Sequence, residues 1–116
     1  MFNYINLSTE KCDFVDVASI GDLPGNERLY LEIDNLQIVI FNIAGQLFAI
    51  GDVCTHDDGP LGDGEREGFE IICPRHGARF DIRTGKVLAL PAVMDIPAYP
   101  VRVVNDRIQV GLPKTE

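Results

Sequence analysis

The sequence has no long apolar run, and this absence excludes a membrane helix. No stretch approaches the roughly 18 consecutive apolar residues that a spanning helix needs. Residues 1–14 also lack the basic start and the small-residue cleavage site of a secretory signal. We therefore expect a cytoplasmic protein with no part in the membrane.

Basic residues and cysteines are also scarce. Lys and Arg number 10 against 18 Asp and Glu, so the formal net charge is −8, which repels nucleic-acid phosphates and anionic lipid head groups. Neither a nucleic acid nor a membrane surface is an expected partner. The chain has three cysteines, an odd number that argues against a disulfide framework and favours metal or redox chemistry.

The remaining composition is that of a folded protein. The chain has 116 residues, of which 46% are hydrophobic and 24% charged, close to globular averages. A chain of this length can bury a single core. Without repeats, linkers or low-complexity tracts, residues 1–116 are expected to form one domain and to exist as a monomer.

Short alternating or β-branched runs, separated by turn residues, predict an all-β protein. Three turn sequences, Asp34-Asn35, Ala44-Gly45 and Asn105-Asp106, lie between such runs and predict hairpins. The expected strands are 14–17, 29–33, 37–41, 47–50, 99–104 and 107–110. This pattern indicates a small antiparallel β sandwich or barrel.

Residues 51–98 have a different composition. They hold seven of the eleven glycines, four of the seven prolines, both histidines and two of the three cysteines. Long loops in a compact domain are usually functional. We expect a small, loop-rich subdomain, inserted between the strands of the β framework.

Two pairs of metal-ligand residues lie in this insertion. Cys54 and His56 form the first pair, and after sixteen intervening positions Cys73 and His76 form the second. Such pairs favour a metal site, because each loop can supply two ligands. A tetrahedral zinc site in an interaction module remains an alternative, but each pair sits among Gly/Pro turns where a zinc finger would place its histidines on a helix. An iron–sulfur centre is favoured.

The sequence C-x-H, followed by C-P-x-H-G, Phe80-Asp81 and Thr84-Gly85, resembles the Rieske [2Fe–2S] family. The resemblance covers at least residues 46–111, including a proline-containing segment at 91–100. It implies one [2Fe–2S] cluster, with Cys54 and Cys73 on one iron and His56 and His76 on the other. It also implies the Rieske-type antiparallel β fold with an inserted cluster-binding subdomain.

The functional implication is electron transfer rather than catalysis. The chain resembles soluble ferredoxins that carry single electrons from a flavin or NAD(P)H-linked reductase to a terminal ring-hydroxylating oxygenase. An alternative within the family is a small subunit of a larger reductase, such as nitrite reductase. The chain itself offers no catalytic residues, since both histidines are assigned to the cluster.

Departures from the high-potential branch of the family indicate a low potential. Those relatives place a Ser where this chain has Ala78, a Tyr where it has Phe80, and two disulfide cysteines where it has Gly59 (or a neighbour) and Arg75. Hydrogen bonds to the cluster sulfurs stabilise the more negative, reduced form, so a chain with fewer such donors is expected to have a lower potential. Asp57 and Asp58 are expected to act in the same direction through their negative charge.

Other residues have less specific interpretations. Cys12 is expected to be a small buried hydrophobe. The arginines Arg75 and Arg79 either contact an acidic partner or pair with local carboxylates, and Leu61 and Pro91 are expected to shield the cluster from water. The acidic residues between the two ligand pairs either steer a basic partner or are solvated: Asp57, Asp58, Asp63, Glu65, Glu67 and Glu70.

Overall fold

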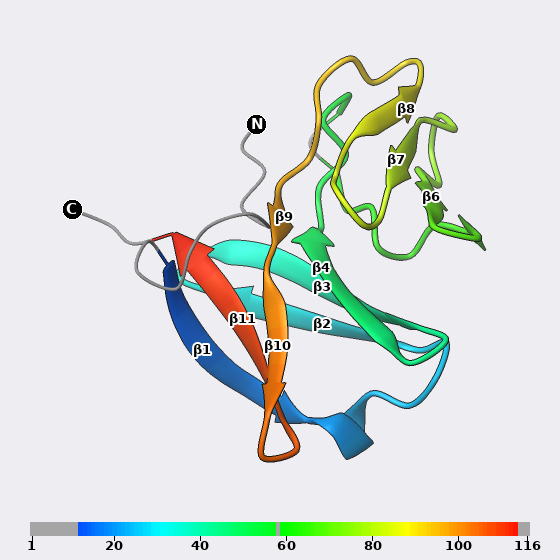
Figure 1. Ribbon diagram of the computed structural model, residues 1–116. Coiled ribbons are helices and arrows are strands. Elements are labelled where there is room, and N and C mark those ends of the chain that lie inside the picture. The colour runs from blue at the N-terminus through cyan, green and yellow to red at the C-terminus, as the bar shows by residue number, and fades with distance from the viewer. Residues whose placement is uncertain (1–11, 58, 114–116) are drawn as a thin grey trace.

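The structure is a computed structural model that describes residues 12–57 and 59–113. Within these ranges it is almost entirely β, which confirms the expected fold class, and its strands form three antiparallel sheets with the orders β1-β11-β10, β2-β3-β4-β9 and β5-β6-β7-β8 (Figure 1). The framework strands are β1 (Cys12–Ser19), β2 (Arg28–Ile33), β3 (Leu36–Ile43), β4 (Gln46–Gly51), β9 (Ala98–Tyr99), β10 (Val101–Val104) and β11 (Arg107–Pro113). The third sheet comprises β5 (Arg66–Glu67), β6 (Glu70–Ile72), β7 (Arg79–Asp81) and β8 (Val87–Ala89).

All three predicted hairpins are present. The turns at Asp34-Asn35, Ala44-Gly45 and Asn105-Asp106 each place both residues at positive φ, between 51° and 88°. Two-residue hairpin loops with this geometry follow the twist of the flanking strands, and Asn, Asp and Gly tolerate it best. The local sequence therefore determined the register of β2 with β3, β3 with β4, and β10 with β11.

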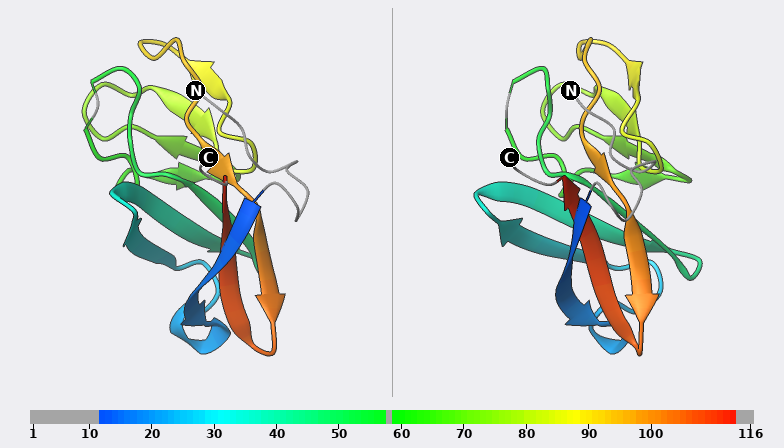
Figure 2. Two further views of the ribbon diagram at one scale, coloured as in Figure 1. Left: turned by 90° about the vertical axis from the view of Figure 1, so that its left-hand side faces the viewer. Right: turned by 60° about the vertical axis from the view of Figure 1, so that its left-hand side comes forward.

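In the sheet β2-β3-β4-β9, the middle of β3 is covered on both faces, so Ile38 to Phe41 are all buried. Alternate side chains of a strand point to opposite faces. Ile38 and Ile40 pack with residues of β10 and β11, whereas Val39 and Phe41 pack with residues of the β5–β8 sheet. The central sheet is thus shared by two hydrophobic cores, in the layered arrangement of Figure 2.

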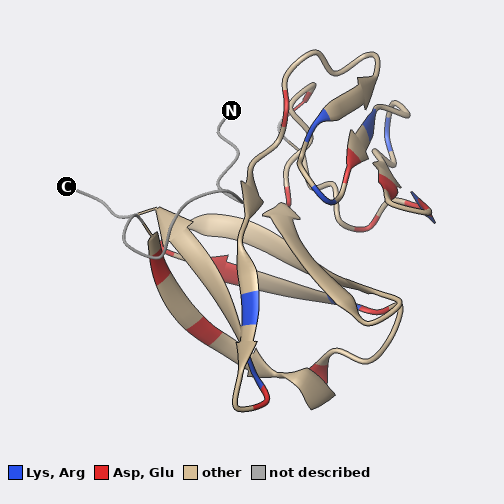
Figure 3. Ribbon diagram, in the orientation of Figure 1, with Lys and Arg blue, Asp and Glu red and all other residues tan. Residues whose placement is uncertain are grey.

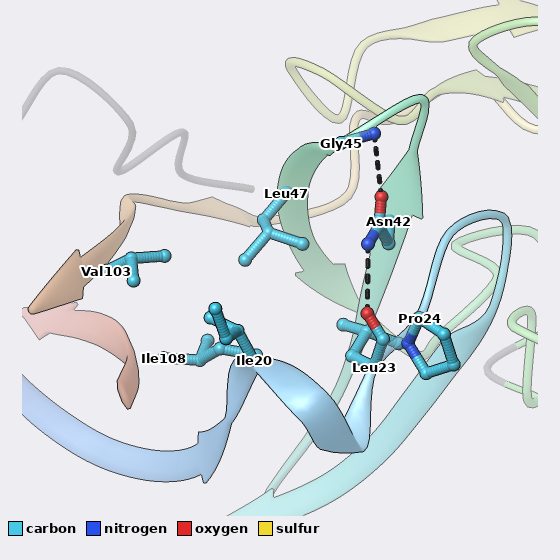
Figure 4. A pocket seen from close by; sticks show the side chains of 8 residues that line it. All are labelled: Ile20, Leu23, Pro24, Asn42, Gly45, Leu47, Val103 and Ile108. Carbon is cyan, nitrogen blue, oxygen red and sulfur yellow. Dashed lines mark hydrogen bonds between the residues drawn. The ribbon is translucent and has the colours of Figure 1, made fainter. Parts of the chain in front are cut away.

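A short segment between β1 and β2 closes one end of the framework. Its 3-10 turn η1 (Ile20–Asp22) is capped by Ser19, whose Oγ accepts a hydrogen bond from the Gly21 N–H. Asn42 of β3 donates to the Leu23 carbonyl at 2.9 Å and accepts from the Gly45 N–H at 2.9 Å. The residues Leu23, Asn42 and Gly45 that form these two bonds line an apolar hollow at the end of the framework away from the inserted sheet (Figure 4). Among the described residues, this three-residue turn is the one helical element, so none of them forms a helix that could cross a membrane.

The insertion contains more regular structure than the sequence indicated. Residues 51–98 were expected to be loop-rich, but they include the whole β5–β8 sheet. Its strands have two or three residues each, too short for the alternation pattern to identify them. Ile71, Phe80 and Ile82 of this part are buried in the same core as Val39 and Phe41.

Candidate metal centre

Two loops carry the four candidate ligands. The first follows β4 and holds Cys54 and His56, and the second joins β6 to β7 and holds Cys73 and His76. Backbone bonds close each loop tightly: Cys54 N–H donates to the Gly59 carbonyl at 2.8 Å, and Cys73 N–H donates to the Ala78 carbonyl at 2.7 Å. The sequence expectation that both pairs lie in turns is met.

The structure brings the two candidate cysteines together and, likewise, the two candidate histidines. The Sγ atoms of Cys54 and Cys73 lie within 4.8 Å of each other, and the rings of His56 and His76 have centroids 5.0 Å apart. Both cysteines are almost fully buried, whereas both histidines are exposed. The centre therefore has a buried thiol side and an imidazole side that faces solvent.

The two thiols have opposite pKa shifts. Burial raises the pKa of Cys54. At Cys73 burial acts in the same direction, but the backbone N–H groups of Arg75 and His76 and the thiol of Cys54 donate hydrogen bonds that lower its pKa overall. Each loop thus directs amide groups at a sulfur atom, an arrangement that stabilises thiolate ligands.

Asp57 also lies within 4.8 Å of the two sulfur atoms, which makes it a possible ligand by position. Its carboxylate is already engaged: Arg75 Nε donates to Oδ2 at 2.5 Å and Arg75 Nη2 to Oδ1 at 2.9 Å. The hydrogen bonds from Arg75 hold the pKa of Asp57 well below its usual range. Oδ2 lies 3.5 Å from His76 Nδ1. The carboxylate thus joins the loops rather than facing a metal.

This pairing corrects one sequence-based expectation. Asp57 was expected to lower the potential by placing negative charge near an iron atom. The guanidinium of Arg75 neutralises that charge at hydrogen-bonding distance, so Asp57 contributes little net field. Asp58 lies outside the described residues.

Several other charged residues of the insertion also have partners within the protein. Arg79 Nη1 lies 2.6 Å from Glu67 and 3.4 Å from Glu70, and Asp63 accepts a hydrogen bond from the Tyr30 hydroxyl at 2.7 Å. For Arg75 and Arg79 the structure thus shows pairing with local carboxylates. Glu65 is exposed. Figure 3 shows the acidic residues distributed over framework and insertion alike.

Residues of the framework support the first loop, and sequence analysis missed them. Arg28 Nη1 donates to the carbonyls of Gly62 and Gly64, and the Tyr30 hydroxyl donates to the Gly62 carbonyl at 3.0 Å. Within the loop itself, Asp52 Oδ1 accepts hydrogen bonds from the N–H groups of Leu61 and Gly62. The alternation in β2 would have placed Arg28 and Tyr30 on one face of the strand. The neighbouring sequence does not predict which segment packs against that face.

Gly64 shows how closely the loop approaches the second sheet. A Cβ atom there would lie 1.8 Å from the Ile72 carbonyl oxygen, so only glycine fits. A third segment also contacts the first loop, since Thr55 Oγ1 donates to the Met94 carbonyl at 2.5 Å. The loop around Cys54 is thus held by β2, β6 and the 90–97 segment.

The other residues singled out from the sequence, Leu61, Pro91 and Cys12, are fully or partly buried. Leu61 is fully buried in the core that also contains Cys54 and Cys73, and Pro91 is partly buried. Their role in shielding a cluster stays a prediction. Cys12 is 3% exposed and forms no disulfide, as expected of a small buried hydrophobe in β1.

The donor set suits a mixed sulfur and nitrogen centre. Two buried thiols with amide donors and two exposed imidazoles arise from the same two loops. A [2Fe–2S] cluster with two thiolate and two imidazole ligands requires this combination. The residues present therefore fit such a cluster.

Comparisons with known proteins agree with this geometry. A family model described as the Rieske [2Fe-2S] domain matches residues 13–100. The ferredoxin component of the naphthalene 1,2-dioxygenase/salicylate 5-hydroxylase systems of Ralstonia sp is 35% identical over 100 residues, which cover 86% of this chain and 96% of that relative. The 3-phenylpropionate/cinnamic acid dioxygenase ferredoxin subunit of Shigella boydii is 35% identical over 98 residues, covering 84% of this chain and 92% of that relative.

A solved structure shows the same arrangement. The ferredoxin of carbazole 1,9a-dioxygenase from Nocardioides aromaticivorans IC177 superposes with a TM-score of 0.79 at 33% identity. The match covers 87% of this chain and 98% of that ferredoxin. Sequence and fold therefore agree over nearly the whole described chain.

Proposed function

Because this chain belongs to the Rieske [2Fe–2S] family, we propose that it is the ferredoxin component of a ring-hydroxylating dioxygenase system. It carries single electrons from a flavin or NAD(P)H-linked reductase to a terminal oxygenase, and is not itself an enzyme. The observation that carries the proposal is that two loops of the insertion bring Cys54 to Cys73 and His56 to His76. The cluster-binding subdomain comprises about residues 51–98 of a single domain, 1–116.

In this proposal Cys54 and Cys73 hold one iron and His56 and His76 the other. When bound, the cluster supplies a one-electron couple whose potential lies above that of all-cysteine clusters, because neutral imidazoles replace two thiolates. The buried cysteines keep water from the sulfur side. The side chain of His76 is 52% exposed, so a partner protein that covers the histidines comes closest to the cluster.

The relatives described above favour a free carrier over the alternatives. Both are named as ferredoxin parts of dioxygenase systems, which supports a separate ferredoxin rather than the small subunit of a larger reductase. The family match likewise supports iron and sulfide over structural zinc. We also propose that the protein is cytoplasmic, because free cysteines are usual in that reducing compartment, and that it is a monomer.

Ligand substitutions test the proposal. Wild-type protein purified without oxygen is expected to be red-brown and to contain two irons and two sulfides, measured by metal and sulfide assays and by EPR of the reduced form. His56→Ala and His76→Ala are each expected to lose the EPR signal, because each removes an iron ligand. Cys12→Ser is the matched control and is expected to keep it. A colourless wild type with stoichiometric zinc, or loss of the cluster from the Cys12 variant, would contradict the assignment.

A further inference from the structure

The two candidate ligand loops have no covalent link. The three cysteines form no disulfide. By the family resemblance, high-potential members have two disulfide cysteines where this chain has Gly59 or a neighbour and Arg75. Two loops that share a cluster must nevertheless keep their ligands at one separation. The contacts between Gly59 and Arg75 show how this chain meets that requirement.

The guanidinium of Arg75 reaches across to the first loop with three of its donor groups. Nε and Nη2 donate to the two carboxylate oxygens of Asp57, and Nη1 donates to the Pro60 carbonyl at 2.7 Å. A planar guanidinium matches a carboxylate in this two-point geometry, which makes such pairs stronger and more directional than single ion pairs. All three bonds run from the second loop to residues 57–60 of the first.

Gly59 makes room for this contact. A Cβ atom at position 59 would lie 2.7 Å from both Cζ and Nη2 of Arg75, closer than real Cβ contacts. The Gly59 N–H also donates to Asp57 Oδ1 at 3.0 Å, which fixes the carboxylate from its own loop. The side chain of Arg75 is 33% exposed and that of Asp57 is 22% exposed, so the pair is partly shielded from water.

We propose that Arg75 and Asp57 form a non-covalent clamp that holds the two ligand loops together in place of a disulfide. The inference rests on the proposed function, because the clamp acts by keeping His56 and His76 in register for one cluster. Both are positioning residues rather than ligands. Unlike a disulfide, the clamp is indifferent to thiol reductants.

Arg75 and Asp57 carry opposite charges. Substitutions at the two positions can therefore distinguish an effect on loop positioning from an effect of charge on the reduction potential. Loss of either member releases the loops, so Asp57→Asn and Arg75→Gln both shorten the lifetime of the cluster. Their effects on the reduction potential have opposite signs: Arg75→Gln leaves Asp57 uncompensated and lowers it, whereas Asp57→Asn leaves Arg75 uncompensated and raises it. Arg75→Lys keeps the charge but loses the two-point geometry.

The test measures cluster loss and potential on the purified holoprotein. Visible absorbance is followed after addition of an iron chelator, for wild type, Asp57→Asn, Arg75→Gln and Arg75→Lys, each with and without dithiothreitol. We expect all three variants to lose the cluster about threefold to tenfold faster than wild type, with no effect of the reductant. Arg75→Lys is expected to keep nearly the wild-type potential by voltammetry.

Arg83→Gln is the matched control. Arg83 also pairs with an aspartate of the insertion, but its partner Asp81 is two residues away and belongs to the same turn. If Arg75→Gln loses the cluster no faster than Arg83→Gln, or if Arg75→Lys is as stable as wild type, the clamp is excluded while the proposed function stands. A wild-type protein that holds no iron–sulfur cluster would overturn the proposed function and, with it, the clamp.

Discussion

Ala78 and Phe80 are the residues through which this site can be tuned. Both are fully buried and pack in the core that contains Cys54 and Cys73. Neither side chain can donate a hydrogen bond, so the backbone N–H groups directed at the sulfurs are left without side-chain help from these two positions. A hydroxyl introduced here would be buried and would need a partner.

Ala78→Ser and Phe80→Tyr are each expected to raise the reduction potential, because a hydroxyl that bonds to a sulfur stabilises the more negative, reduced form. A bond stronger by about 1 to 2 kcal/mol in the reduced state corresponds to roughly 40 to 85 mV for one electron. Voltammetry of the single and double variants measures the shift. An absent or negative shift, with an intact EPR signal, would show that these missing hydrogen bonds do not set the potential.

Tyr30 is expected to make the stability of the protein sensitive to alkaline pH. Burial raises the pKa of Tyr30, and the hydrogen bond to Asp63 and its charge raise it further. A raised pKa means that the folded state favours the neutral phenol. The neutral phenol of Tyr30 therefore contributes fully to the free energy of unfolding below the ordinary tyrosine pKa of about 10. This contribution is lost as the pH rises through the pKa of Tyr30 in the folded state.

Tyr30→Phe should remove this component, so the variant should show a smaller fall in melting temperature above pH 10 than wild type. The difference between their tyrosinate absorbance titrations should give the pKa of Tyr30 itself. Asp63→Asn keeps an acceptor but removes the charge, and it should bring that pKa down towards 10. Equal alkaline sensitivity in wild type and Tyr30→Phe would rule the assignment out.

At the scale of elements, the β3–β4 hairpin contains the least suitable turn residue. Ala44 has φ of 53°, in the left-handed region that residues with a Cβ atom generally avoid. The other two hairpins place Asp and Asn in this conformation, and these residues tolerate it. Gly45 and the bond from its N–H to Asn42 hold the turn in place despite Ala44.

Ala44→Asn is expected to stabilise the protein by about 1 kcal/mol, because Asn-Gly is the favoured pair for this turn. Thermal unfolding monitored by circular dichroism should show a higher Tm. Ala44→Val, which introduces a β-branched side chain at the same φ, should lower it. A Tm order of Val above Asn would contradict the interpretation of the turn.

On the scale of the whole molecule, the net negative charge is not concentrated around the candidate centre. The net charge is −8, yet several acidic residues near the candidate centre are paired with Arg75, Arg79 or Tyr30. We therefore expect attraction to a basic partner to arise from the whole charge distribution, which Figure 3 shows spread over framework and insertion, rather than from an acidic loop. Local pairs contribute little beyond a Debye length of about 8 Å at physiological salt.

Electron transfer with a physiological partner is expected to slow as salt is added, because screening weakens the attraction between a negatively charged carrier and a basic docking surface. Stopped-flow reduction at increasing NaCl concentrations measures this dependence. Glu65→Gln, in the exposed part of the insertion, should reduce the salt dependence only slightly if the whole charge steers. An electron-transfer rate that does not change with salt would show that the net charge of the protein does not promote its association with the partner.

Local sequence by itself determined several features of this protein. The turns at residues 34–35, 44–45 and 105–106 specify their own hairpins because their backbone conformations are set within two residues. The pairs Cys54/His56 and Cys73/His76 could be proposed as ligands because each pair lies within one short turn. The fold class and the family followed from these two signals.

Only the tertiary structure decided how the parts meet. The strands of the β5–β8 sheet are too short for a sequence period, and they form because Ile71 and Phe80 share a core with β3. The bonds from Arg28 to Gly62 and from Arg75 to Asp57 join residues 34 and 18 positions apart, so no local pattern encodes them. Neighbouring residues determine the backbone conformation of a turn, whereas contacts between distant segments depend on the packing of the whole chain.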